Sequence, residues 1–183
     1  MDAAELARLT GLAEGYRGHL GRWRRAVQLQ DERIRAHPWQ AGLLDRSVDT
    51  ELFAVCLRNL LQACWACHGC FDQPNHTPFK DAIERFEATV PHVRVIRDRL
   101  QQFDRYGNDV NLDVFITSDE PDAWHMAPEG YSLHVNEVRL DLASAAREAD
   151  RLAATALKTL DYVLYMLRIT GHPPVWPEEQ TSA

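Results

Sequence analysis

Three of the four cysteines in this chain fall within residues 64–70, which read CWACHGC. The Cys-x-x-Cys-His part of this segment is the signature of covalent c-type haem attachment, and the Cys-x-x-Cys-x-x-Cys spacing is similar to that of iron–sulfur ligands. On a helix, residues at i, i+3 and i+4 share one face, so two thiolates and the imidazole could also bind zinc. One hypothesis is therefore a metal- or redox-linked protein. Its residues are Cys64, Cys67, His68 and Cys70.

A purely structural role also explains these cysteines, and we favour it. Apolar residues recur at spacings of four, four and three over Cys56, Leu60, Cys64 and Cys67. They lie on one side of a helix, where free cysteine packs as a small hydrophobic residue. Residues 1–5 carry acids and no basic region followed by an apolar one, so we expect no secretory signal and a reducing, cytoplasmic location. Because haem attachment normally requires export, we expect no cofactor, with zinc as the alternative.

The composition narrows the class of protein. The chain has 183 residues, of which 45% are hydrophobic and 26% charged, and its net charge is −7. This length suits one domain with a sizeable core, and we predict a single helical domain over residues 1–172 with a loose tail over 173–183. No uncharged stretch is long enough to span a membrane, and the negative charge argues against DNA as a partner. No Walker sequence or Gly-x-Ser-x-Gly elbow offers a site for catalysis.

The apolar residues predict a bundle of helices. They recur at spacings of three and four, typical of amphipathic helices, over residues 1–36, about 49–68, about 79–88, about 92–106 and 142–170. Glycines between Gly11 and Gly21 lower helix propensity, so we expect a break or a close backbone contact in the first helix. Gly171 predicts the end of the last helix. The expected fold class is mainly α, a four- to five-helix up-down bundle with a small β-hairpin insert before the last helix.

The first and last helices have the most regular apolar stripes. In the first helix the predicted stripe consists of Leu6, Leu9, Ala13, Tyr16, Leu20, Trp23, Val27, Gln30 and Ile34. In the last helix it consists of Leu142, Ala146, Ala149, Ala153, Ala156, Leu160, Val163 and Leu167. Both stripes follow a near-heptad spacing, which indicates long helices packed along one another.

Residues 109–140 do not follow the helical pattern. Apolar and polar residues alternate over residues 110–117 and again over 131–136, a period of two that is typical of strands, and the step at Asn136 predicts a hairpin turn. The segment holds seven acids and no lysine or arginine before its last two residues. The combined charge of these seven acids equals the net charge of the chain, so the charges of the remaining residues nearly cancel. We therefore predict an acidic β-like insert.

Residues 95–107 read VIRDRLQQFDRYG. With Phe86 and Pro91 before it, this segment resembles a helix of the bacterial HEPN-like helical-bundle proteins. In that family an Arg-Asp-x-x-x-His-Phe-Asp-x-Tyr type of helix carries the Arg-x4–6-His motif of metal-independent ribonucleases. Residues 57–61, which read LRNLL, are similar to another helix of the same family. The resemblance covers about residues 20–107 and, by shape, the last helix.

The resemblance implies a phosphate-binding groove without its catalytic base. Arg97 matches the arginine of the motif, and a guanidinium is a permanent cation for phosphate. The histidine position is Gln102, whose amide can donate a hydrogen bond but cannot transfer a proton near neutral pH. The resemblance therefore implies a non-catalytic homodimer that binds RNA or a protein partner. The vestigial groove consists of Arg97, Asp98, Gln102 and Tyr106. A ribonuclease with an unusual base and a structural salt bridge of Arg97 are the alternatives.

Overall fold

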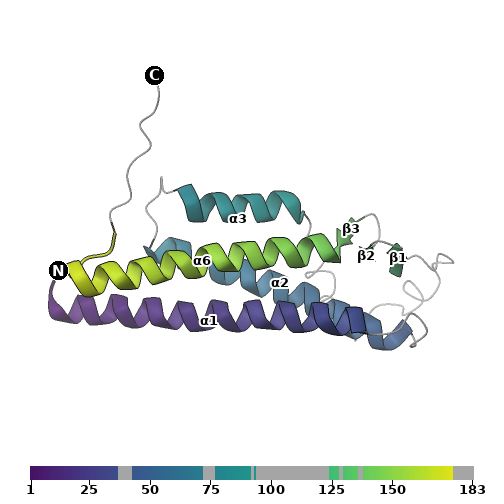
Figure 1. Ribbon diagram of the computed structural model, residues 1–183, viewed down its shortest axis with the longest axis horizontal. Coiled ribbons are helices and arrows are strands. Elements are labelled where there is room, and N and C mark those ends of the chain that lie inside the picture. The colour runs from purple at the N-terminus through teal and green to yellow at the C-terminus, as the bar shows by residue number, and fades with distance from the viewer. Residues whose placement is uncertain are drawn as a thin grey trace, which may run out of the picture.

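The protein is a mainly α, up-down helical bundle, as the sequence predicts. The computed structural model describes residues 1–36, 43–71, 77–91, 93, 124–127, 130–135 and 138–174. Its long helices are α1 (Ala3–Ala36), α2 (Leu43–Phe71), α3 (Thr77–Thr89) and α6 (Leu142–Thr170). Successive helices run in opposite directions, with α1 and α6 side by side over most of their length and α3 packed on α6 (Figure 1). No helix in the described ranges is both long and apolar enough to cross a membrane.

Helix α1 packs against the core through a stripe of apolar residues that are seven positions apart. Ala13, Leu20, Val27 and Ile34 are buried, and Leu6, Leu9, Tyr16 and Trp23 are partly buried against the same core. The helix is continuous, so the predicted break between Gly11 and Gly21 is wrong. The predicted close contact is wrong as well, because a Cβ added at any of the α1 glycines would meet no atom within 4 Å. Packing along the whole stripe outweighs the glycine cost of about 0.8–1 kcal/mol per residue.

Helix α6 is capped at both ends by the residues that flank it. The Ser144 amide donates to the side chain of Asp141, which caps the N-terminus and satisfies one free N–H group. Gly171 adopts φ 69°, a left-handed conformation that glycine tolerates, and its N–H donates to the Leu167 carbonyl at 3.1 Å. The predicted end of the last helix is therefore confirmed.

Helices α2 and α3 complete the core and extend beyond their predicted ends. Helix α2 covers residues 43–71 instead of about 49–68, and α3 covers 77–89 instead of about 79–88. The largest buried side chains of these helices are Phe53, Leu57, Leu60, Leu61, Phe79, Ile83 and Phe86. Helix α3 ends before Pro91, as the sequence predicts. The predicted helix over residues 92–106, apart from its second residue, lies outside the described residues.

A small antiparallel sheet precedes α6. It has the strands β1 (Trp124–Ala127), β2 (Gly130–Val135) and β3 (Val138–Asp141) in the order β1-β2-β3. Val135 pairs with Val138, so β2 and β3 form the predicted hairpin around residues 136 and 137. The sequence did not predict β1 because its four residues, WHMA, are too few for a clear alternation. The predicted strand over residues 110–117 lies outside the described residues.

Candidate functional site

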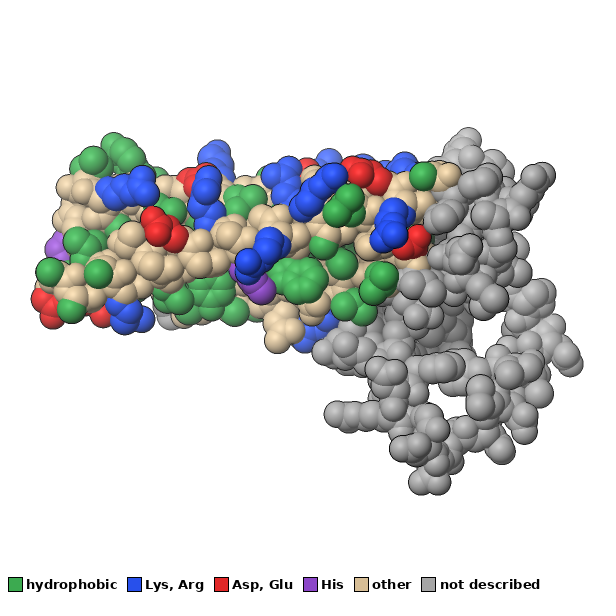
Figure 2. All heavy atoms as spheres, turned by 90° about the horizontal axis from the view of Figure 1, so that it is seen from below, with side chains coloured by type: hydrophobic (Ala, Val, Ile, Leu, Met, Phe, Trp, Pro, Cys, Tyr) green, Lys and Arg blue, Asp and Glu red, His purple; other side chains and the backbone are tan. Residues whose placement is uncertain are grey.

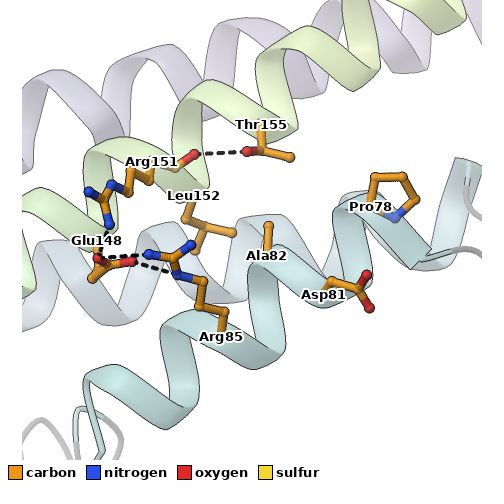
Figure 3. Close-up of a pocket in the computed structure, with 8 residues that line it drawn as sticks. All are labelled: Pro78, Asp81, Ala82, Arg85, Glu148, Arg151, Leu152 and Thr155. Atoms are coloured by element: carbon orange, nitrogen blue, oxygen red, sulfur yellow. Dashed lines mark hydrogen bonds and ion pairs between the residues drawn. The ribbon is translucent and has the colours of Figure 1, made fainter.

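A cleft of about 240 Å³ lies between α3 and α6, where charged side chains of both helices meet. It is lined by Pro78, Asp81, Ala82, Arg85, Glu148, Arg151, Leu152 and Thr155. Figure 3 shows Arg85 of α3 and Arg151 of α6 both reaching the carboxylate of Glu148. The Asp81 carboxylate points away from both guanidinium groups in this view. The cleft therefore has an arginine pair at one end.

Glu148 organises this pair. Its side chain is only 10% exposed, and its Oε1 atom lies 2.6 Å from Arg151 Nη1. On the other side, Arg85 Nε lies 3.3 Å from Oε2, and Arg85 Nη2 donates to Oε1 at 3.4 Å. Burying a carboxylate is costly unless cations and hydrogen bonds compensate for the lost water. Glu148 consequently holds two guanidinium groups in place at the mouth of the cleft.

The arginine side chains keep much of their surface in solvent. Arg85 is 61% exposed and Arg151 is 62% exposed. Each guanidinium has five N–H donors, of which Glu148 uses one or two, so the others face water or a ligand. A fixed pair of guanidinium groups is suited to the oxygen atoms of a phosphate or carboxylate.

Packing of the two helices positions these groups. On α3, Ile83 and Phe86 are buried on either side of Arg85 in sequence and anchor that turn of the helix. On α6, Ala149 and Leu152 are buried and fix the rotation of the helix, which brings Glu148 to the edge of the core. Thr155 Oγ1 donates to the carbonyl oxygen of Arg151 at 3.0 Å, one turn along α6. The site thus rests on two rigid helices.

Further cations extend from the cleft along the exposed face of α6. Arg147, Arg151 and Lys158 follow one another at spacings of four and seven residues, which places them along one face of the helix. Neither Arg147 nor Lys158 forms an ion pair within the described part of the chain, and both residues are exposed. We call Arg85, Arg147, Arg151 and Lys158 the cationic stripe.

The residues that line the cleft include two arginines, Arg85 and Arg151, and two carboxylates, those of Asp81 and Glu148. No histidine or cysteine is among the residues that line it. Its arginines are permanently charged, so they can bind an anion at any pH near neutrality. The exposed N–H groups of the arginine pair are therefore the part of the cleft that is suited to an anion.

The predicted groove residues cannot be placed relative to this cleft. Arg97, Asp98, Gln102 and Tyr106 all lie outside the described residues.

The cysteine cluster is divided between the core and the surface. Cys56, Cys64 and Cys67 are buried, whereas Cys70 is exposed, and none of the four forms a disulfide. Burial raises the pKa of the Cys56 and Cys64 thiols. Sγ of Cys70 lies 3.6 Å from the Tyr16 hydroxyl, and this hydrogen bond together with burial raises the pKa of Tyr16 to about 12. The spacing thus correctly placed Cys56, Cys64 and Cys67 on the core side of α2.

His68 has an aromatic environment. Its ring centroid lies 5.7 Å from that of Trp65 and 6.1 Å from that of Phe79. Across the described side chains, no group of three or more histidine, cysteine, aspartate or glutamate residues could hold a metal ion together. The structure therefore does not bring Cys64, Cys67, His68 and Cys70 together as one ligand set.

Sequence reasoning missed the role of Glu148. A signal for it was present, because an acid lies between Ala145 and Ala149 on the apolar side of the last helix, next to Arg147 and Arg151. An acid at such a position needs a cationic partner. The partner on α3, Arg85, could not be found from local spacing.

The fold and site define a mainly α helical bundle with an arginine-flanked cleft. No family model, curated protein or solved structure matches the chain.

Proposed function

We propose that this chain is a non-catalytic, HEPN-like binding module that holds RNA by its phosphate groups along the cationic stripe. The observation that carries the proposal is the convergence of Arg85 and Arg151 on the buried carboxylate of Glu148, at 3.3 and 2.6 Å. Contacts to phosphate oxygens provide most of the affinity of sequence-independent nucleic-acid binding. Arginine side chains that are already ordered before the ligand arrives lose less conformational entropy when they bind it.

The length of the stripe suits an extended polyanion. Arg147 and Lys158 are eleven residues apart on one helix, which corresponds to about 16 Å along the axis. A segment of a single strand can place several phosphates over that distance. The net charge of −7 does not oppose this, because the acids of residues 109–140 account for it and the bundle itself is close to neutral.

RNA, as opposed to DNA or a protein, is proposed from the resemblance of residues 95–107 to the HEPN-like helix. The absence of catalysis is proposed from Gln102, which replaces the histidine of the motif. A guanidinium without a proton-transfer partner can bind a phosphate but cannot assist cleavage by acid–base chemistry. Binding of a protein partner is the alternative function.

Fluorescence anisotropy with a labelled single-stranded RNA tests the proposal on the full chain. Arg147→Gln with Lys158→Gln removes two cations that have no ion-pair partner among the described residues, so the fold should not change. We expect binding to weaken at least about tenfold. Each phosphate contact to a single strand contributes about 0.7 to the magnitude of the slope of log K against log salt, so the loss of two contacts should reduce that magnitude by about 1.4.

The matched control is Arg8→Gln with Arg25→Gln, which changes the net charge equally but on α1, away from the stripe. If the control weakens RNA binding as much as the stripe variant, binding follows net charge and the site is wrong. No binding of RNA by the wild-type chain would also contradict the proposal, whereas equal binding of single-stranded DNA would contradict only the choice of RNA, because both strands offer phosphates.

A further inference from the structure

Asp81 lines the cleft between α3 and α6 without a partner of its own. Its side chain is exposed, and it is the one acid among the described side chains that takes part in no hydrogen bond or ion pair. Other exposed acids are paired, because Asp161 Oδ1 lies 2.6 Å from Arg17 Nε and Glu32 Oε1 lies 3.1 Å from Arg25 Nη1. Figure 2, which looks at the bundle from the α1 side, shows acids and cations interspersed. The Asp81 carboxylate is therefore available to a ligand.

The fold engages the usual partner of Asp81 elsewhere. Arg85 lies four residues later on α3, a spacing at which an aspartate and an arginine attract each other across one helical turn. Arg85 instead reaches α6, where its Nε lies 3.3 Å from Glu148 Oε2. The Asp81 carboxylate points away from both guanidinium groups in Figure 3. The ion pair between the helices thus leaves an acceptor one turn away from the arginine pair.

Thr155 lies at the same end of the cleft as Asp81. Helices α3 and α6 run in opposite directions, so four residues before Arg85 and four residues after Arg151 lead to the same end. Figure 3 shows Asp81 and Thr155 on the same side of the arginine pair. The Thr155 hydroxyl donates its proton to the Arg151 carbonyl at 3.0 Å, so its oxygen can only accept a further hydrogen bond. This end of the cleft therefore presents acceptors, whereas the arginine pair presents donors.

A single strand of RNA carries groups that match both ends. Its phosphate oxygens accept hydrogen bonds, which suits the arginine pair. Its 2′-hydroxyl is the only hydrogen-bond donor of the sugar–phosphate backbone, and DNA lacks it. Asp81 and Arg85 are one turn apart, about 5.4 Å along the helix axis, which is comparable with the span from a phosphate to the 2′-hydroxyl of an adjoining ribose. A second phosphate beside Asp81 would meet a like charge, so a ribose fits better there.

We propose that Asp81 accepts a hydrogen bond from a 2′-hydroxyl of the bound strand and so makes the cleft selective for RNA over DNA. This inference rests on the proposed function, in which phosphates lie along the cationic stripe. One phosphate next to this ribose then lies at Arg85 and Arg151, and the strand continues toward Lys158. Leu152, which lines the cleft between its two ends, offers an apolar contact to the ribose. Asp81 thus determines specificity, whereas the arginine pair provides affinity.

Fluorescence anisotropy of the full chain with three labelled strands of equal length tests this role. The strands are oligouridine, its 2′-deoxy analogue and its 2′-fluoro analogue, which keeps the sugar shape of RNA but donates no hydrogen bond from that position. We expect wild type to bind oligouridine at least about fivefold more tightly than either analogue, because both lack the donor for the Asp81 carboxylate. In Asp81→Ala this preference should fall below about twofold, and the 2′-deoxy strand should bind more tightly than to wild type, because the repulsive charge is removed.

Glu84→Gln is the matched control. Glu84 is exposed three residues from Asp81 on α3 and does not line the cleft, and its carboxylate lies 3.7 Å from Lys80 Nζ. The substitution removes the same charge, so it should change the affinity for all three strands by one common factor and leave their ratios unchanged. Asp81 has no partner to lose, so Asp81→Ala should fold as wild type does, which circular dichroism establishes for both variants.

Equal binding of the three strands by wild type overturns the role of Asp81. An Asp81→Ala variant that keeps the full preference, or a Glu84→Gln variant that loses it, overturns that role as well. If wild type binds the three strands equally and Arg147→Gln with Lys158→Gln weakens them alike, phosphate binding along the cationic stripe stands and only the role of Asp81 fails. If no strand binds, the proposed function fails too.

Discussion

Arg85 and Glu148 are 63 residues apart in the chain, yet they form an ion pair between α3 and α6 with Nε 3.3 Å from Oε2. The two partners differ sharply in environment, because the arginine side chain is 61% exposed and the glutamate side chain only 10%. Arg151, also exposed, completes the charge compensation from the other side. Because of this asymmetry, removal of the cations and removal of the carboxylate charge should lower the free energy of unfolding by different amounts.

Removal of the two arginines should destabilise the protein more than neutralisation of the glutamate. In Arg85→Met with Arg151→Met, the aliphatic packing is kept but a nearly buried carboxylate remains without cations. We expect a loss of about 2–3 kcal/mol in the free energy of unfolding, against about 1 kcal/mol for Glu148→Gln, which leaves only solvated cations. Urea unfolding at pH 7 measures both. If Glu148→Gln lowers the free energy of unfolding as much as the double variant does, this explanation is contradicted.

Alanine at the α1 glycines should stabilise the protein. Gly15 and Gly18 are exposed within the continuous helix, and a Cβ at either position meets no atom within 4 Å. Each substitution is expected to raise the free energy of unfolding by about 0.8–1 kcal/mol, and the pair to raise Tm by roughly 4–8 °C. Gly171→Ala is the opposing control, because φ is 69° there and alanine should lower Tm. Thermal unfolding, monitored by circular dichroism, tests both the expected rise and the expected fall in Tm.

Cys70 should be the one rapidly modified thiol. It is exposed, whereas Cys56, Cys64 and Cys67 are buried, and burial raises the pKa of Cys64, which lowers its thiolate fraction. Intact-mass analysis after brief iodoacetamide treatment should show one adduct on the native protein and four in denaturant. Cys70→Ser should then show none in the native state. A second fast adduct would mean that the core side of α2 opens readily.

Asp150 should contribute to stability only above acidic pH. Arg24 donates to its carboxylate at 2.8 Å and holds the pKa of Asp150 below its ordinary value, with a further hydrogen bond from Gln28. A lowered folded-state pKa adds stability above the unfolded value of about 3.9, and this stability is lost as the pH falls through the folded value. Asp150→Asn should therefore be less stable than wild type at pH 7.

The difference at pH 7 should be at most about 1 kcal/mol, because Asp150 is 45% exposed and solvent screens the pair. It should shrink towards zero as the pH falls from about 5 to 2, where wild type is protonated as well. Urea unfolding of both proteins across this range makes the comparison. A difference that stays constant to pH 2 would show that the charge of Asp150 is not responsible.

Gln102→His should restore ribonuclease activity. The substitution supplies the group that can transfer a proton, five residues after Arg97. We expect EDTA-resistant cleavage of RNA by Gln102→His and none by Gln102→His/Arg97→Ala or by wild type. Cleavage by wild type that Arg97→Ala abolishes would instead establish an active ribonuclease with an unusual base. An inactive Gln102→His variant that also fails to bind RNA would remove the support for the groove.

The amino-acid sequence alone predicts the helices and several of their ends. Local periodicity predicts the stripe through Leu20, Val27 and Ile34, because its neighbouring members are two turns apart. Local capping predicts the end at Gly171, which bonds to a residue one turn earlier. The same reasoning placed Cys56, Cys64 and Cys67 on the core side of α2. It erred at the α1 glycines, because a local propensity of about 1 kcal/mol is small beside packing along the whole helix.

Only the tertiary structure decides what those helices place together. The contact of Arg85 with Glu148, and the ion pairs of Asp161 and Arg168 with α1, depend on how far α3, α6 and α1 rotate and slide against one another. Those rotations are set by the packing of the entire core, including Phe86 and Leu152, and no short segment encodes them. Helical periodicity therefore specifies which face of each helix is buried, whereas the packing of all the helices specifies which charges meet.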